Sequence, residues 1–345
     1  MHGRQATGFR YPCHLAQRGH RIGQVLQQLV SVRQIDAVVR QIHRIRVHDG
    51  ELDVCNALGP WSFVEIGDGY PGTVIEIPEA QTLARQMQAM LMGKTIVRAR
   101  AATSPHGFAW YFGDPADYAA TLEGRTVTGT AAFGGHPELI AEDARLAFCD
   151  GVNIRYFEPG AKRPVKHQLE LVFDDDSAIV CIVQMYGAMW AFPEGANDND
   201  YYLVATEKPS PLGDAFDANI FASLNTDPRL SAKAFLATEQ RIPGLGNGVL
   251  QDILWTAGLH PKRKMGGLSE AEFDGLFHAV KTVLAEMTSH GGRDTEKDLF
   301  GNPGGYEVAL SRNTCEAPCR RCGGAIVRQS YMGGNIYFCE DCQRL

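Results

Sequence analysis

The stretch Arg241–Asp252 reads Arg-Ile-Pro-Gly-Leu-Gly-Asn-Gly-Val-Leu-Gln-Asp and separates two segments of helical periodicity. Apolar residues recur at helical spacing before it and again from Val249 to Trp255. The part from Pro243 to Gly248 is too rich in glycine to continue either helix, and glycine lets a backbone turn tightly and approach a ligand. Free amides at the start of the second helix would favour an anion such as phosphate. The alternative is a helix–turn–helix corner without a ligand.

Four cysteines near the end of the chain have the spacing of a tetrahedral metal site. Two Cys-x2-Cys pairs are separated by 16 residues, and each pair can direct two thiolates at one ion. The sequence therefore predicts one structural Zn²⁺ bound by Cys319, Cys322, Cys339 and Cys342. Two disulfides are the weaker alternative, because nothing else in the sequence indicates export.

The residues between the two cysteine pairs predict a β-hairpin. Residues 325–328 and 336–338 are rich in β-forming side chains, and Gly333-Gly334-Asn335 supplies a turn. A hairpin this short buries little apolar surface, so the metal is expected to supply its folding energy. Cys315 lies off the spacing and is expected to be a bystander.

Three landmarks in a fixed order resemble the formamidopyrimidine-DNA glycosylase / endonuclease VIII family. They are Ile77-Pro78-Glu79, then Pro243-Gly244-Leu245-Gly246-Asn247, then the finger that ends in Cys342-Gln343. The resemblance extends from Val74 to Leu345. It includes two segments that lead into the finger, Gly291-Gly292-Arg293-Asp294 and Pro303-Gly304-Gly305-Tyr306.

The residues after Val74 predict an α+β fold. Pro78 suits the first position of a helix, and Gly93 ends its apolar stripe. Five β-rich runs follow, which favour an antiparallel β-sandwich lobe: 95–99, 126–130, 145–148, 168–173 and 178–185. Together with the resemblance, this predicts a glycosylase-like β-sandwich domain at 74–205, a helix–two-turn–helix DNA-binding domain at 214–300 and a zinc finger at 310–345.

Residues 1–73 form an extension of unusual composition. They hold eight arginines, no lysine and five of the 11 histidines. A disordered arm, a small extra domain and upstream sequence translated from too early a start codon are the three explanations. The third is favoured, because the resemblance begins abruptly at Val74.

Composition points to a soluble cytoplasmic protein. No apolar run approaches the ~20 residues that span a bilayer, and the nine cysteines, four in a metal pattern, fit a reducing compartment. The net charge of −7 is unusual for a DNA-binding protein. The acidic excess lies in residues 74–227, with 11 basic and 21 acidic side chains, whereas residues 228–345 hold 14 and 13.

The resemblance implies a catalytic site at the start of the matched region. In the family, an N-terminal amine, normally that of a proline, attacks C1′ of a damaged nucleoside while a glutamate moves protons. Glu76 takes the place of that glutamate, and Glu79 matches a supporting position. Ile75 stands where the family has proline and can act only if its amine is the free N-terminus. Otherwise, Glu76 is a strand residue and Glu79 a helix-start charge.

The resemblance also implies residues that contact DNA. Asn247 matches a phosphate-contacting asparagine, with Gly246 and Gly248 on either side. His136 falls near the position of a catalytic-site lysine, and Met185 falls where a methionine fills the space left by an extruded base. The alternatives are an ordinary loop histidine and a core methionine.

The function implied is that of a DNA base-excision repair glycosylase acting on oxidised or ring-opened bases in damaged double-stranded DNA. We expect a monomer, with strand cleavage by an AP lyase step left open. Without a free amine, Glu76 would activate water and remove a base without nicking the strand. The alternative is a DNA-damage-binding protein of the same fold that has lost catalysis. A finger that serves RNA or a protein partner is less favoured.

Overall fold

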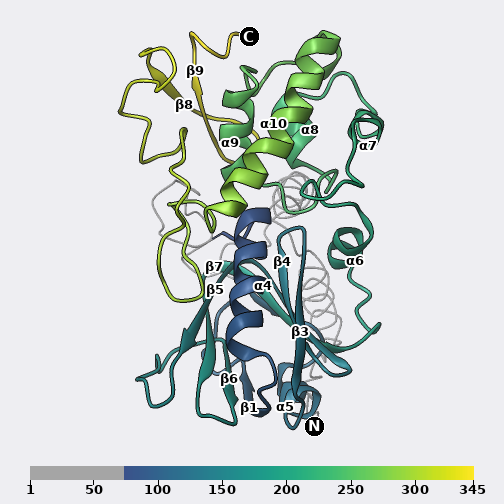
Figure 1. Cartoon of the computed structure of the whole chain (residues 1–345), viewed down its shortest axis with the longest axis vertical. Helices are drawn as coiled ribbons and strands as arrows, with labels where there is room; N and C mark the ends of the chain where they lie inside the picture. The colour runs from purple at the N-terminus through teal and green to yellow at the C-terminus, as the bar shows by residue number, and fades with distance from the viewer. Residues whose placement is uncertain (1–73) are drawn as a thin grey trace, which may run out of the picture.

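The computed structural model describes residues 74–345, and the extension at residues 1–73 lies outside the described residues. Figure 1 shows a β-rich lobe and a helical lobe stacked along the long axis, with helix α4 running along the β-rich lobe and one of its ends at the boundary. The helices are α4 (Ile77–Leu91), α5 (Tyr118–Leu122), α6 (Asp200–Glu207), α7 (Ala218–Ser223), α8 (Ala232–Ala237), α9 (Asn247–Thr256) and α10 (Glu270–Ser289). The strands are β1 (Ile96–Ala101), β2 (Ala109–Tyr111), β3 (Val127–Phe133), β4 (His136–Ala141), β5 (Ala144–Phe157), β6 (Leu169–Phe173), β7 (Ala178–Pro193), β8 (Ile326–Ser330) and β9 (Asn335–Cys339).

The α+β class and the antiparallel lobe are confirmed. Its seven strands form one continuous sheet in the order β1-β6-β7-β5-β4-β3, with β2 added parallel to β7. Strands β5 and β7 are longer than the sequence runs predicted, and β4 completes a hairpin with β3. The edges β1 and β3 approach each other through a Thr95–Thr126 bridge, so the sheet curls almost into a barrel.

Helix α4 begins where proline and two acidic residues predict. Glu76 is the N-cap, and its carboxylate and that of Glu79 form a reciprocal capping box with Pro78 in the first turn. The apolar stripe of α4 packs on the inner face of the sheet, with Leu83, Met87 and other members of the lobe's main core. This packing fixes the start of α4 at the boundary between the lobes.

The helical lobe has its own core, built from α7, α8, α9 and α10. A group of phenylalanine rings fills it, including Phe221 and Phe235 with centroids 5.1 Å apart. The β8–β9 hairpin is present where predicted, and β9 packs on α9. Within residues 74–345, no helix is long and apolar enough to cross a membrane.

Candidate functional site

Glu76 joins the two lobes by capping two helices at once. Its Oε1 accepts from the amide of Gly248 at 2.9 Å, and its Oε2 accepts from those of Gly246 at 3.2 Å and Val249 at 2.9 Å. The same residue is the N-cap of α4. The start of α9 therefore holds an anion, as the glycine-rich turn predicted, but this anion is an internal carboxylate. The expectation that the amides of Gly246 and Gly248 are free for a phosphate is corrected accordingly.

The glycines of this turn permit a very close approach of the two lobes. A Cβ at Gly246 would lie 2.5 Å from Oε1 of Glu76, and one at Gly248 would overlap Nη1 of Arg293. Gly244 has φ +76° and packs on the backbone of Gly135. The amide of Ile77 donates to the carbonyl of Gly244 at 3.1 Å. Any side chain here would push the lobes apart.

Arg293 is the buried centre of an acid cluster that sequence analysis missed. Its guanidinium bonds Glu79 through Nε at 3.0 Å and Nη2 at 2.9 Å, and its Nη1 lies 3.7 Å from Glu76. Glu296 is a third carboxylate, 3.9 Å from Nη2. Burial opposes charge on Arg293, but the carboxylates of Glu79, Glu76 and Glu296 raise its pKa well above the ordinary value.

Of the three carboxyl groups, Glu296 lies farthest from the Arg293 guanidinium. Burial raises the pKa of Glu296 to about 8, against the opposing pull of Arg293 and with the added repulsion of Glu79. One oxygen accepts from the backbone nitrogen of Val74 at 2.7 Å. Three carboxylates around one guanidinium leave an excess of negative charge, so Glu296 carries a proton at neutral pH.

Ile75 lies beside this cluster, with its backbone engaged in the sheet. Its amide donates to the carbonyl of Asp150 at 2.8 Å, and its side chain is in the main core. In the sequence as numbered from Met1, this nitrogen belongs to a peptide bond. The structure therefore places Glu76 and Glu79 around Arg293, next to Ile75, and a catalytic role for these residues stays a prediction.

Asn247 connects the start of α9 to the finger. Its Nδ2 donates to the carbonyl of Asn335 at 3.0 Å, and Nε2 of Gln251 donates to the same oxygen at 3.1 Å. Nζ of Lys233 donates to the carbonyl of Tyr331 at 2.7 Å. The turn of the hairpin is thus fixed beside the α9 start, although DNA contact by Asn247 stays a prediction.

His136 does not reach the site. It is 1% exposed and lies among the rings of Trp190, Tyr201 and Tyr202, with centroids 5.0 to 6.1 Å away. Burial lowers the pKa of His136 to about 4, although Nδ1 lies 3.0 Å from the carbonyl of Phe133. The prediction that His136 contacts DNA is corrected, because a side chain buried inside the β-lobe cannot reach a DNA strand.

Met185 lies in a wide bulge of β7. Val183 pairs with Val152 and Gly187 with Asp150, so that residues 184–186 face the single residue Gly151. Bulges next to active sites redirect side chains away from the sheet. The half-buried Met185 is available at the surface of the lobe, and base replacement by it stays a prediction.

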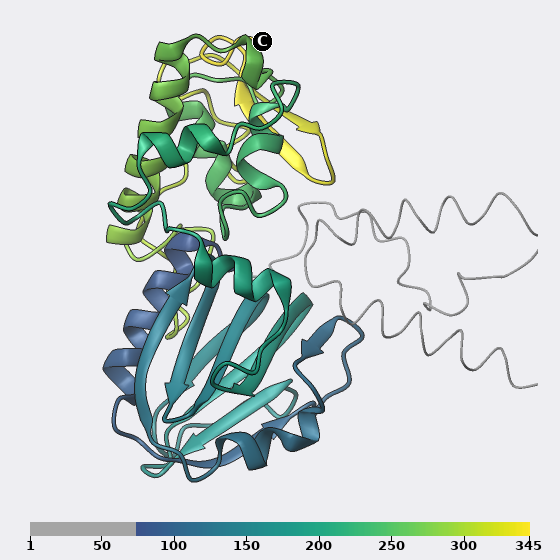
Figure 2. The same cartoon turned by 90° about the vertical axis from the view of Figure 1, so that its right-hand side faces the viewer.

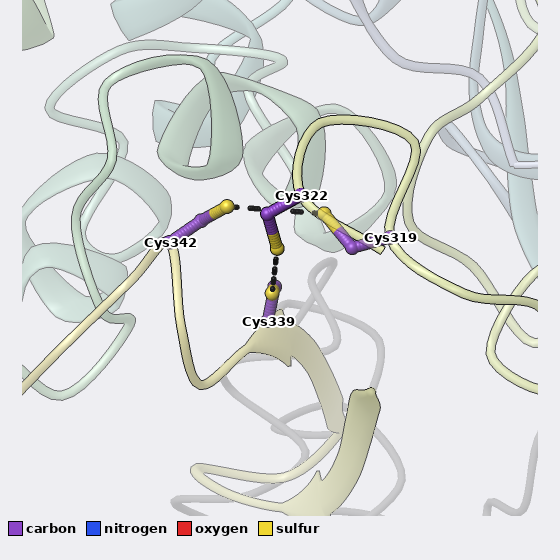
Figure 3. Close-up of side chains that lie close together, drawn as sticks. All are labelled: Cys319, Cys322, Cys339 and Cys342. Carbon is purple, nitrogen blue, oxygen red and sulfur yellow. Dashed lines mark hydrogen bonds between the residues drawn. The ribbon is translucent and has the colours of Figure 1, made fainter. Parts of the chain in front are cut away.

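The four finger cysteines converge on one point, as Figure 3 shows. Their sulfur atoms all lie within 4.8 Å of one another, with Cys319 and Cys342 at 3.9 Å and Cys322 and Cys339 at 3.5 Å. This set can hold a metal ion. Indole Nε1 of Trp255 lies 3.4 Å from the sulfur of Cys319, which adds an outer contact from α9.

Cys315, which is near these four cysteines in the sequence, lies outside the four-cysteine cluster. Its sulfur lies 3.2 Å from the carbonyl of Arg312. The expected bystander role of Cys315 agrees with this placement.

Comparisons with known proteins match this geometry. Residues 208–298 match the family model described as the formamidopyrimidine-DNA glycosylase H2TH domain. The formamidopyrimidine-DNA glycosylases of Nocardia farcinica and Geobacillus kaustophilus are 28% and 26% identical, over 78% of this chain and 97% and 99% of theirs.

Solved structures agree in fold. A complex of Lactococcus lactis Fpg with DNA containing an abasic site aligns with a TM-score of 0.69 and 23% identity, over 78% of this chain and all of that one. Thermus thermophilus MutM (Fpg) aligns with a TM-score of 0.66 and 24% identity, over 78% and 98%. The chain has the fold class of the helix–two-turn–helix glycosylases. Its features are the sheet lobe, the capped glycine turn and the four-cysteine finger. Over 78% of its length, the chain is thus similar in sequence to formamidopyrimidine-DNA glycosylases and shares the fold of their solved structures.

Proposed function

We propose that this chain is a DNA glycosylase of base-excision repair that acts on oxidised or ring-opened bases in duplex DNA. The observation that carries the proposal is the Glu76 junction, where one carboxylate fixes the start of α4 to the start of α9. The finger turn is bonded to the same end of α9 through Asn247. A structure that shares this fold is a complex of Lactococcus lactis Fpg with DNA containing an abasic site.

We propose that phosphate binding and the chemical step are divided between the regions of the chain. Residues 214–300 and 310–345 together hold 14 of the 25 lysines and arginines in residues 74–345, and phosphate contacts set affinity without reading bases. Residues 74–205 contribute Glu76 and Glu79 to the acid cluster beside the reacting nucleotide, and residues 214–300 contribute Arg293 and Glu296. A protein working as a cytoplasmic monomer on duplex DNA is the simplest assembly consistent with this division.

The direct test is incubation of the metal-loaded protein with duplexes that carry an oxidised purine, a ring-opened purine or an abasic site, at low ionic strength. Base release and strand nicking are measured separately. Release of a damaged base, lost in Glu76→Gln, supports the proposal. Failure to bind or process any of these duplexes overturns it.

A strand-cleaving lyase step requires a free amine, and we propose that a chain beginning at residue 74 or 75 supplies it. The amine would form an imine with C1′ as the base leaves, and elimination would then cut the strand. The hydrogen bond from the backbone nitrogen of Val74 to Glu296 places a carboxyl group beside such a terminus. Borohydride trapping of DNA on the full chain and on a chain starting at Val74 separates the forms. Equal trapping by both overturns the start-site proposal.

We propose Zn²⁺ as the ion of the four-cysteine site. Zinc–sulfur bonds of ~2.3 Å in a tetrahedron place sulfur atoms about 3.8 Å apart, close to the 3.9 Å and 3.5 Å pairs here. The ion would hold the hairpin beside α9 and take no part in the chemistry. Metal analysis of the purified protein tests this, with one zinc per chain expected.

A DNA-damage-binding protein without catalysis is the second candidate. Ile75, in place of the family's proline and with its nitrogen bonded to the carbonyl of Asp150, favours it. Tight binding of an abasic duplex, with neither base release nor borohydride adduct from either form of the chain, would select this candidate.

A further inference from the structure

Three aromatic side chains form a row that runs from the surface of the β-lobe to the bulge of β7. The ring centroids of Phe108 and Trp110 are 6.4 Å apart, and those of Trp110 and Tyr186 are 6.3 Å apart. Phe108, at the outer end, is 48% exposed. A large apolar ring held in solvent beside two others is available for contact with a partner.

The backbone holds this row in place. Strand β2 pairs with β7 from Gly187 to Met189, and the amide of Gly187 donates to the carbonyl of Phe108 at 3.0 Å. Nε2 of His106 lies 3.4 Å from the carbonyl of Gln184. The row is therefore attached to both ends of the bulge at residues 184–186.

The inner end of the row reaches the site. Gly187 pairs with Asp150, whose carbonyl accepts from the amide of Ile75. Burial, followed by the negative charges of Asp150 and Glu76, raises the pKa of Tyr186 above its ordinary value. The row therefore ends at Tyr186, next to the Gly187–Asp150 pair that bonds Ile75.

Charge decides which part of a nucleotide can lie on this surface. Residues 74–227 hold 21 acidic against 11 basic side chains, and Glu76, Glu79 and Glu296 lie at the inner end. The acidic excess of this lobe disfavours the phosphates of a nucleotide, whereas a base is neutral and planar. In Figure 2, the short blue strand β2 and the yellow β8–β9 hairpin project from the same side of the molecule, so a strand held by the finger can present a base to the row.

We propose that Phe108 and Trp110 form a stacking surface for a nucleobase displaced from the duplex next to the lesion. This rests on the proposed function and adds to it a contact on the β-lobe. Aromatic stacking is sequence-tolerant, because every base has a π-face. The surface would therefore recognise unstacked bases of any identity and leave intact duplex unrecognised.

Phe108→Ala tests the proposal, with Phe300→Ala as a matched control. Phe300 is 46% exposed and contacts Tyr156 edge to face at 6.2 Å, as Phe108 contacts Trp110. Binding of the full chain to an abasic duplex and to an intact duplex is measured by fluorescence anisotropy. Phe108→Ala should weaken abasic binding about ten- to a hundredfold and leave intact binding and the melting temperature unchanged, whereas Phe300→Ala should change neither.

A second measurement reports stacking itself. 2-Aminopurine placed at each position around the abasic site should be quenched by the wild-type protein at one position and regain fluorescence with Phe108→Ala. If the wild type binds the abasic duplex and Phe108→Ala binds it and quenches 2-aminopurine equally well, the stacking surface is overturned and the proposed function stands. Equal loss on abasic and intact duplexes overturns it too. Absence of wild-type binding to damaged DNA instead overturns the proposed function.

Discussion

The buried proton on Glu296 leads to a stability prediction for the variant Glu296→Gln. The glutamine keeps an oxygen for the backbone nitrogen of Val74 but cannot ionise. Burial and the neighbouring carboxylates raise the pKa of Glu296 from 4.5 to about 8. The folded protein therefore binds a proton more tightly than the unfolded chain does.

The direction and size of the pH effect on the free energy of unfolding follow from this difference in proton affinity. Unfolding releases the proton from Glu296 between pH 4.5 and about 8, so the free energy of unfolding falls as pH rises through this window and levels off above it. With about 1.4 kcal/mol for each pKa unit, the wild-type protein loses on the order of 4 to 5 kcal/mol through this group. Glu296→Gln does not undergo this loss.

The assay is urea or thermal unfolding from pH 5 to pH 9, with the exposed Glu207→Gln as a control. Glu296→Gln should match the wild type near pH 5 and exceed it by several kcal/mol at pH 9, while the control follows the wild-type curve. Parallel curves for wild type and Glu296→Gln would refute the buried proton. A variant less stable at every pH would show instead that Arg293 needs an ionised Glu296.

Four further outcomes follow from the junction and the finger. Glu76→Gln should abolish turnover with little loss of DNA affinity and lower the free energy of unfolding by about 1 to 3 kcal/mol, because three amides lose a charged acceptor; unimpaired turnover would remove Glu76 from the mechanism. Gly248→Ala should destabilise the lobe junction, since its Cβ overlaps the Arg293 guanidinium, and an unchanged melting temperature would contradict the close packing. Asn247→Ala should weaken binding to all DNA sequences alike, so an effect confined to one lesion would count against a phosphate contact. Chelation of the metal should release the β8–β9 hairpin and reduce DNA affinity while the β-lobe stays folded, as circular dichroism and limited proteolysis can report.

Features that depend on neighbouring residues were predictable from the sequence. Pro78 and its acidic neighbours set the start of α4, and the glycine-rich turn set the start of α9 at Asn247. The cysteine spacing gave the metal cluster and the hairpin between its halves. Each of these follows from backbone geometry or ligand reach within a few residues, which composition and spacing record directly.

The long-range partners were decided only by tertiary structure. Glu76 meets the α9 amides from 170 to 173 residues away, and the same amides looked free for phosphate in the sequence. His136 looked like a loop residue, yet the β3–β4 hairpin buries it among rings from β7 and α6. Arg293 gathers carboxylates from α4 and its own segment. A local pattern gives a side chain its chemistry, but packing between distant segments selects its partner and its access to solvent.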